Sequence, residues 1–140
     1  MYIFRLDNHL EIPVQLHLFK GTAEEIVLVD SGATENFIDQ ETIKQLKLRT
    51  KKLEQSVKLK NIDGSFNKAG SITHYLNLLV SWGNKKMTER FYITNLGSDR
   101  LILGYPWLRA FNPTIDWPTC KLLGPPVKIE TLLHSRYSKL

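Results

Sequence analysis

An uninterrupted apolar run that ends in a carboxylate and a tight turn restricts the fold of this chain more than any other feature. Residues 26–29 read Ile-Val-Leu-Val and lead directly into Asp30, Ser31 and Gly32. Because apolar and polar side chains do not alternate, the run predicts a short strand that is buried on both faces. An unpaired carboxylate is costly to bury, so Asp30 is expected to have a use at the end of this strand.

The turn itself allows a structural and a catalytic interpretation. Asp followed by Ser-Gly is ordinary turn chemistry, since the Asp side chain accepts hydrogen bonds from the backbone that follows. Gly32 permits backbone conformations that other residues resist and lets another chain approach closely, and Ser31 offers a hydroxyl that can tie the turn to a neighbour. A calcium loop fits poorly, because Gly32 and Thr34 stand where acidic ligands would be needed.

Short strands separated by turn residues account for most of the chain, with two short helices among them. Helices are expected at residues 39–48, with Asp39 as N-cap, and at residues 105–111. The expected strands are residues 2–6, 12–19, 25–30, 57–61, 71–82, 90–94, 99–103, 114–117 and 120–122. This pattern predicts an all-β fold class, with a closed β-domain over residues 1–123 and a linker or C-terminal tail over residues 124–140.

Several motifs resemble those of a known protein family. Residues 30–33, Asp-Ser-Gly-Ala, resemble the Asp-Thr/Ser-Gly signature of retropepsin-like aspartic proteases, and residues 101–104, Leu-Ile-Leu-Gly, resemble the hydrophobic-hydrophobic-Gly step of the same family. Longer strings that look like proteases of gypsy-type long-terminal-repeat retrotransposons are found at residues 29–38, 102–108 and 112–117. Because the motifs follow the family order over residues 10–123, the resemblance implies a retropepsin-like closed β-barrel.

The resemblance also implies a role for each residue around the turn. Asp30 would be the catalytic carboxylate, Ser31 would hydrogen-bond between two active-site loops, and Gly32 would allow their close packing. Ala33 would border the substrate. Ser31 stands where viral members commonly carry Thr, a change that keeps the hydroxyl and loses a methyl group. Structural support next to the site would come from Ile102, Leu103 and Gly104.

A flap is expected between the two motifs. Residues 61–70 lie where the family places a hairpin that closes over an extended peptide, adding main-chain hydrogen bonds and excluding water. A plain exposed hairpin is the alternative, since an Asp-Gly-Ser sequence is an ordinary hairpin signal. The expected flap and substrate-binding residues are Ile62, Asp63, Gly64, Ser65 and Phe66.

The sequence supplies one of the two carboxylates that peptide hydrolysis by an aspartic protease requires. Hydrolysis without a metal or a covalent intermediate uses two carboxylates and one water: one carboxylate is the general base and the other, protonated, hydrogen-bonds the scissile carbonyl. The order Asp-Ser-Gly occurs once in the chain. A homodimer is therefore expected, in which Asp30 meets Asp30 of the partner subunit across a two-fold axis, with no metal and no other cofactor.

The function implied is that of an aspartic endopeptidase that cuts extended segments of its own retrotransposon polyprotein. One alternative is a catalytically silent retropepsin-like dimerisation or scaffold module, although the undamaged signature speaks against it. Another is a small basic β-barrel that binds nucleic acid, as the formal net charge of +5 suggests. The basic residues are scattered, so at most weak and non-specific contact with nucleic acid is expected.

The remaining sequence features favour a cytoplasmic setting, with virus-like particles implied by the resemblance. No apolar run approaches the roughly 18 to 20 residues that span a membrane, so no membrane partner is expected. The first residues lack the pattern of a secretory signal. Cys120 is the single cysteine, which excludes a disulfide within one chain and fits a reducing compartment.

Overall fold

The computed structural model describes residues 10–60, 66–119 and 121–123. Nine strands and two short helices follow one another in these segments. The strands are β1 (Leu10–Leu18), β2 (Gly21–Val29), β3 (Asn36–Asp39), β4 (Lys51–Lys60), β5 (Phe66–Trp82), β6 (Lys85–Thr94), β7 (Leu101–Leu103), β8 (Ile115–Asp116) and β9 (Lys121–Leu122). The helices are α1 (Gln40–Gln45) and α2 (Tyr105–Phe111).

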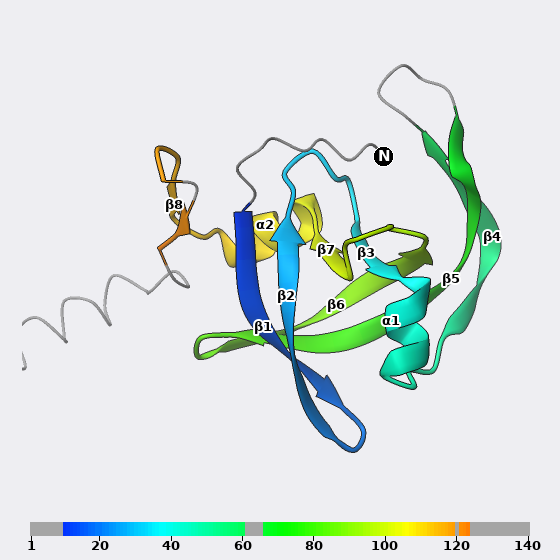
Figure 1. Cartoon of the computed structure of the whole chain (residues 1–140), viewed down its shortest axis with the longest axis horizontal. Coiled ribbons are helices and arrows are strands. Elements are labelled where there is room, and N and C mark those ends of the chain that lie inside the picture. Colours follow the sequence, from blue (N-terminus) through cyan, green and yellow to red (C-terminus); the bar gives the residue numbers. More distant parts are fainter. Residues whose placement is uncertain (1–9, 61–65, 120, 124–140) are drawn as a thin grey trace, which may run out of the picture.

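Six of the strands close into a barrel. Their order is β1-β2-β7-β3-β6-β5, and antiparallel pairing of residues 15–17 in β1 with residues 79–81 in β5 completes the ring (Figure 1). β7 lies between β2, to which it is parallel, and β3, to which it is antiparallel. The predicted mainly-β fold with a closed barrel is therefore confirmed.

β5 belongs to two parts of the molecule. Between Tyr75 and Trp82 it pairs with β6 as part of the barrel. Its earlier residues pair with β4 and leave the barrel as a two-stranded extension (Figure 1), which we call the β4–β5 ribbon (residues 51–60 and 66–75). Two register shifts along this pairing bend the ribbon, as β-bulges do. The strands predicted at residues 57–61 and 71–82 are thus antiparallel neighbours, as expected, although β5 already begins at Phe66.

The β4–β5 ribbon explains why the apolar run of β2 does not alternate. Val27 and Val29 face the barrel core, while Leu28 joins a second apolar cluster that includes Leu59 of β4. Both faces of β2 are therefore covered near its end, as the sequence predicts. The prediction is wrong for Ile26, whose side chain is 54% exposed, because it lies on the outer face one step before the second cluster begins.

α2 packs against the barrel through aromatic rings. Trp107 is fully buried, with its ring centroid 4.8 Å from that of Phe111 and 5.6 Å from that of Trp82 in β5. The helix predicted at residues 105–111 is confirmed with the same bounds. It ends where Asn112 adopts a left-handed conformation with φ of 46°, a common way to terminate a helix.

α1 is shorter than the sequence predicts. Asp39 caps it as expected, because its side chain accepts a hydrogen bond from the backbone N–H of Glu41 at 3.0 Å. The helix ends early, at Gln45, because Lys47 takes a left-handed conformation with φ of 53°. The preceding strand β3 was not predicted, and the strand expected at residues 2–6 lies outside the described residues.

Candidate active site

Asp30 lies where β2 passes into the turn. Its backbone N–H donates to the Leu103 carbonyl of β7 at 2.9 Å, which continues the pairing of two parallel strands. Its Oδ1 atom accepts a hydrogen bond from the backbone N–H of Gly32 at 2.9 Å, and the N–H of Ala33 donates to its carbonyl at 3.1 Å. Asp30 is 7% exposed, so the turn holds a largely buried carboxylate in one orientation.

The bond from Gly32 to Asp30 is the Asx turn that the structural interpretation expects, so turn geometry alone does not distinguish the two interpretations. The burial of the residues after Asp30 is a second observation on this turn. Ala33 is completely buried while Ser31, at the tip, is exposed. A buried carboxylate therefore lies beside a hydroxyl that is accessible at the surface of the chain.

Gly104 packs directly against the backbone of this turn. A Cβ atom at this position would lie 2.2 Å from the carbonyl oxygen of Glu35 and 2.6 Å from that of Ala33. The next backbone N–H, that of Tyr105, donates to the same Ala33 carbonyl at 2.8 Å. The absence of a side chain at Gly104 thus lets the start of α2 support the residues that follow Asp30.

A buried hydrogen-bond chain links Gly104 to β6. The N–H of Gly104 donates to Oδ1 of Asn36 at 2.9 Å, and Nδ2 of Asn36 donates to Oε2 of Glu89 at 3.0 Å and to the Arg90 carbonyl at 3.3 Å. Asn36 and Glu89 are 1% and 7% exposed. Burial raises the pKa of Glu89 above its ordinary value of 4.5, and the hydrogen bond from Asn36 partly offsets that effect.

A cavity of about 180 Å³ lies beside the residues that follow the turn. Its walls come from Thr34 and Glu35, which follow the turn, from Phe37 of β3, and from Val57 and Ile72 of the β4–β5 ribbon. The ribbon and the residues that follow the Asp30 turn therefore line one cavity together.

Ile62, Asp63, Gly64 and Ser65 lie outside the described residues, and Phe66 begins β5 opposite Lys60 of β4. The residues expected beside the turn are placed more fully: Ile102 is in the second apolar cluster, and Leu103 is in the barrel core.

A model of the PEG10/RTL1 protease domain matches residues 26–128 of the sequence, a segment that contains both the Asp30 turn and Gly104. The chain belongs to the PEG10/RTL1 protease-domain family. The resemblance to retropepsin-like proteases of gypsy-type elements is thereby confirmed.

Solved structures agree with the PEG10/RTL1 assignment at the level of the fold. The chain is similar to an EIAV protease in complex with the inhibitor HBY-793, with 16% identity and a TM-score of 0.56 over 81% of this chain and 97% of that one. It is similar to the retroviral protease-like domain of Ddi1 from Leishmania major, with 15% identity and a TM-score of 0.56 over 85% of this chain and 90% of that one. A retropepsin-like aspartic protease from Rickettsia conorii is also similar, with 17% identity and a TM-score of 0.54 over 82% of each chain.

Sequence reasoning missed two residues of this candidate site. Asn36 and Glu89 are far apart in the sequence and carry no motif, yet they meet beneath Gly104. The available signal was the polar Asn36 within a stretch that folds as a wholly buried strand, β3. Within the described segments, no group of three or more His, Cys, Asp or Glu side chains is placed to hold a metal ion, and no helix has the length and apolar character needed to cross a bilayer.

Proposed function

We propose that two copies of this chain form an aspartic endopeptidase, with Asp30 of each copy supplying one carboxylate. The observation that carries the proposal is the placement of Asp30: it is a largely buried carboxylate, oriented by Gly32, in a turn whose next residues line a cavity together with the β4–β5 ribbon. One carboxylate would take a proton from the attacking water while the other, protonated, would hydrogen-bond the scissile carbonyl.

The exposed Ser31 supports the dimeric form of the proposal. Its hydroxyl lies at the tip of the turn, where it is accessible to the matching turn of a second copy. Two carboxylates brought together in this way cannot both ionise freely, so the pair would share a proton. Cleavage should therefore be fastest at mildly acidic pH.

The proposed substrate is an extended segment of the retrotransposon polyprotein, held by strand addition under the ribbon. Apolar residues around the cleaved bond fit the apolar walls at Phe37, Val57 and Ile72. In this proposal residues 1–123 form the protease domain, residues 124–140 a linker or tail, and Ile62 to Phe66 the flap. The enzyme would act in the cytoplasm, within virus-like particles, and would need no cofactor.

A cleavage assay on a peptide library from about pH 4 to about pH 8 tests the proposal, because general acid–base catalysis depends on protonation state. The Asp30→Asn variant should lose cleavage by about 10²- to 10⁴-fold, the usual contribution of such a group. Glu24→Gln is a matched control: it removes a carboxylate from the same strand, β2, at an exposed position.

Cleavage by the parent chain and by Glu24→Gln, but not by Asp30→Asn, supports the proposal. Equal cleavage by the parent and Asp30→Asn contradicts it. If a demonstrably dimeric parent cuts no peptide in the library, the scaffold alternative takes its place.

A further inference from the structure

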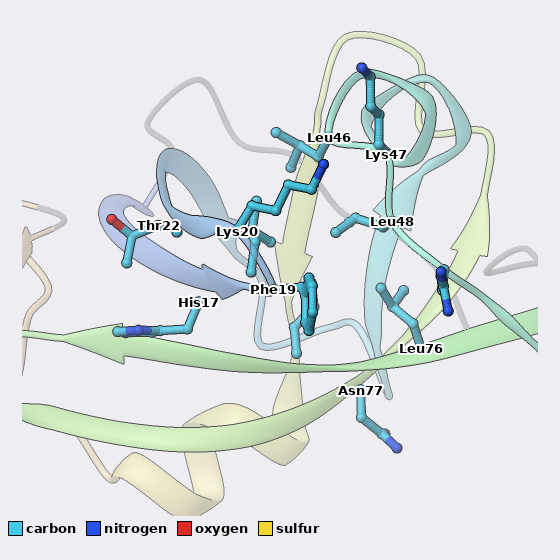
Figure 2. Close-up of a pocket in the computed structure, with 13 residues that line it drawn as sticks. His17, Phe19, Lys20, Thr22, Leu46, Lys47, Leu48, Leu76 and Asn77 are labelled. Carbon is cyan, nitrogen blue, oxygen red and sulfur yellow. The ribbon is translucent and has the colours of Figure 1, made fainter.

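A recess that the structure describes lies away from Asp30. It has a volume of about 670 Å³ and is formed by the β1–β2 turn, the residues that follow α1, and the middle of β5 (Figure 2). None of its described lining residues belongs to the turn that carries Asp30 or to the start of α2. We call it the barrel-mouth pocket, because its base is the end of the barrel core.

The base of the barrel-mouth pocket is apolar. Leu76 and Leu78 of β5 are buried members of the core, and Leu18, Leu46 and Leu48 are half-buried around them. Apolar side chains that line a recess of this size are typical of sites that take up an apolar group, and the mouth of a barrel is a common position for such sites.

Phe19 adds exposed aromatic surface to the same place. It lies in the β1–β2 turn, is 103% exposed, and appears among the lining residues in Figure 2. A side chain with this exposure buries none of its apolar area within the chain, so packing of the monomer does not explain why a Phe stands at this position. Apolar surface beside a recess marks an interaction site more often than isolated apolar residues do.

The rim of the barrel-mouth pocket is basic. Lys20, Lys47 and Arg49 line it and are exposed, and none of its described lining residues is acidic. His17 lies in the wall, with its Nε2 atom 2.9 Å from the Ser81 hydroxyl. The three cations come from two separate segments, so the local excess of positive charge is a product of the fold.

β5 has an open edge at this point. Two strands pair with the same edge of β5. β4 pairs with it as far as Tyr75, and β1 pairs with it from Leu79 onward. Within the described part of the chain, no strand pairs with residues 76–78 on that edge. An extended main chain can use such a gap, because it offers backbone hydrogen-bonding groups beside the recess.

We propose that the barrel-mouth pocket docks an acidic linear segment of a partner protein, in which a Leu- or Phe-sized side chain is flanked by carboxylates. The apolar side chain would enter between Phe19 and the leucines, and the carboxylates would meet Lys20, Lys47 and Arg49. Charge complementarity selects an acidic partner, and the open edge of β5 favours an extended peptide. The site is separate from Asp30 and does not depend on peptidase activity.

Fluorescence polarisation with a labelled peptide of alternating Asp and Leu or Phe residues tests the proposal on the full chain. A peptide with Lys in place of each Asp is the charge control. Binding of the acidic peptide should weaken about tenfold or more in Lys20→Glu/Lys47→Glu/Arg49→Glu, and also when salt rises from about 50 mM to about 300 mM. A control with the same charge change is Lys85→Glu/Lys86→Glu/Lys121→Glu, whose residues do not line the pocket.

Phe19→Ser tests the apolar part of the site. Because Phe19 is fully exposed, the variant should keep its folding stability, yet bind the acidic peptide several-fold more weakly. Asp30→Asn should bind as the parent does, which separates docking from the proposed catalysis.

Equal binding of the acidic and Lys-containing peptides would overturn the proposal, as would equal weakening by the two triple variants. So would an absence of binding to the acidic peptide by a folded parent chain. Binding of phosphatidylserine vesicles or of a single-stranded oligonucleotide in its place, lost in the first triple variant, would assign the pocket to a membrane or to nucleic acid and would also overturn the proposal.

Discussion

Gly104 shows how the absence of a side chain lets two backbone segments pack closely beside the Asp30 turn. Its backbone lies against the carbonyl oxygens of Ala33 and Glu35, and its N–H donates to Asn36. The two carbonyl oxygens are backbone atoms and cannot rotate away as a flexible side chain would. The space at Gly104 therefore determines the position of the segment that follows Asp30.

Gly104→Ala should shift this segment and reduce cleavage. Overpacking of this kind costs about 1–3 kcal/mol of folding stability, which thermal unfolding can measure. Gly97→Ala is a useful comparison, because Gly97 has φ of +69° and open space around it, so only backbone strain is added. At a temperature where both variants are folded, only Gly104→Ala should lose peptidase activity; full activity in that variant would contradict the argument.

Glu89 should make the stability of the chain depend on pH. Its pKa is raised in the folded state by burial, so between 4.5 and the folded-state value the folded chain binds more protons than the unfolded chain. Its contribution to stability is therefore fully present below pH 4.5 and is lost as the pH rises through the folded-state pKa.

Glu89→Gln removes this titration and keeps an oxygen that can accept the hydrogen bond from Asn36. Above pH 4.5 the variant should become more stable relative to the parent as the pH rises, measured by the free energy of unfolding. The full difference should be about 1.4 kcal/mol for each unit by which folding raises the pKa of Glu89. Urea unfolding at several pH values measures the difference, with Glu24→Gln as a control for the loss of one exposed charge. A difference that does not vary with pH would contradict the prediction.

At the scale of elements, Asp39 joins β3 and α1 to the segment between β6 and β7. Its Oδ2 atom accepts the N–H of Glu41 and so caps α1, while its Oδ1 atom accepts the N–H of Leu96 at 2.8 Å in the segment between β6 and β7. Asp39 also ends β3 and is 7% exposed. One carboxylate thus satisfies two backbone donors that would otherwise lack a partner at this junction.

Asp39→Ala should lower the free energy of unfolding by about 2–4 kcal/mol, since it removes a helix cap and leaves a buried donor unsatisfied. Asp39→Asn keeps one acceptor oxygen, so it should lose less. Urea unfolding of both variants measures the effect. Equal losses in the two variants would show that the charge, and not the number of acceptors, determines the stability at this junction.

The elements also show which parts of the fold were visible in the sequence. α2 was predicted with its observed bounds because a helix-starting Pro106 and the helix-ending Asn112 frame it. β3 was missed because its four residues include Asn36 and Asp39, polar side chains that depress strand propensity. Their burial is compensated by Gly104, Glu89 and Leu96, partners that are remote in sequence.

The candidate site also has features that were visible in the sequence and features that were not. Asp30, Gly32 and Gly104 belong to local motifs, so the sequence identified them. The contact of Gly104 with the turn depends on β7 being inserted between β2 and β3, a feature of the topology that no local pattern encodes. The cavity shared with the β4–β5 ribbon also requires the assembled fold.

At the scale of the whole molecule, the proposed chemistry uses two carboxylates, of which one chain would supply one. Refolding the parent chain with about a threefold excess of Asp30→Asn should leave roughly a quarter of the parent chains paired with another parent chain, if pairing is random. Peptidase activity should fall to about the same fraction. The same excess of further parent chain should raise activity, and an unchanged rate in the mixture would show that the active species is a monomer.

The attachment of the β4–β5 ribbon has a consequence for how this family can vary in length. Within the described part of the chain β4 pairs with β5 alone, so insertion or deletion along the ribbon leaves every pairing inside the barrel unchanged. A single inserted residue would move Leu59 to the opposite face of its strand, whereas a pair of residues would not. During evolution the sequence separating the Asp30 and Gly104 motifs should therefore drift mainly in steps of two residues per strand, while the segments carrying the motifs keep their lengths.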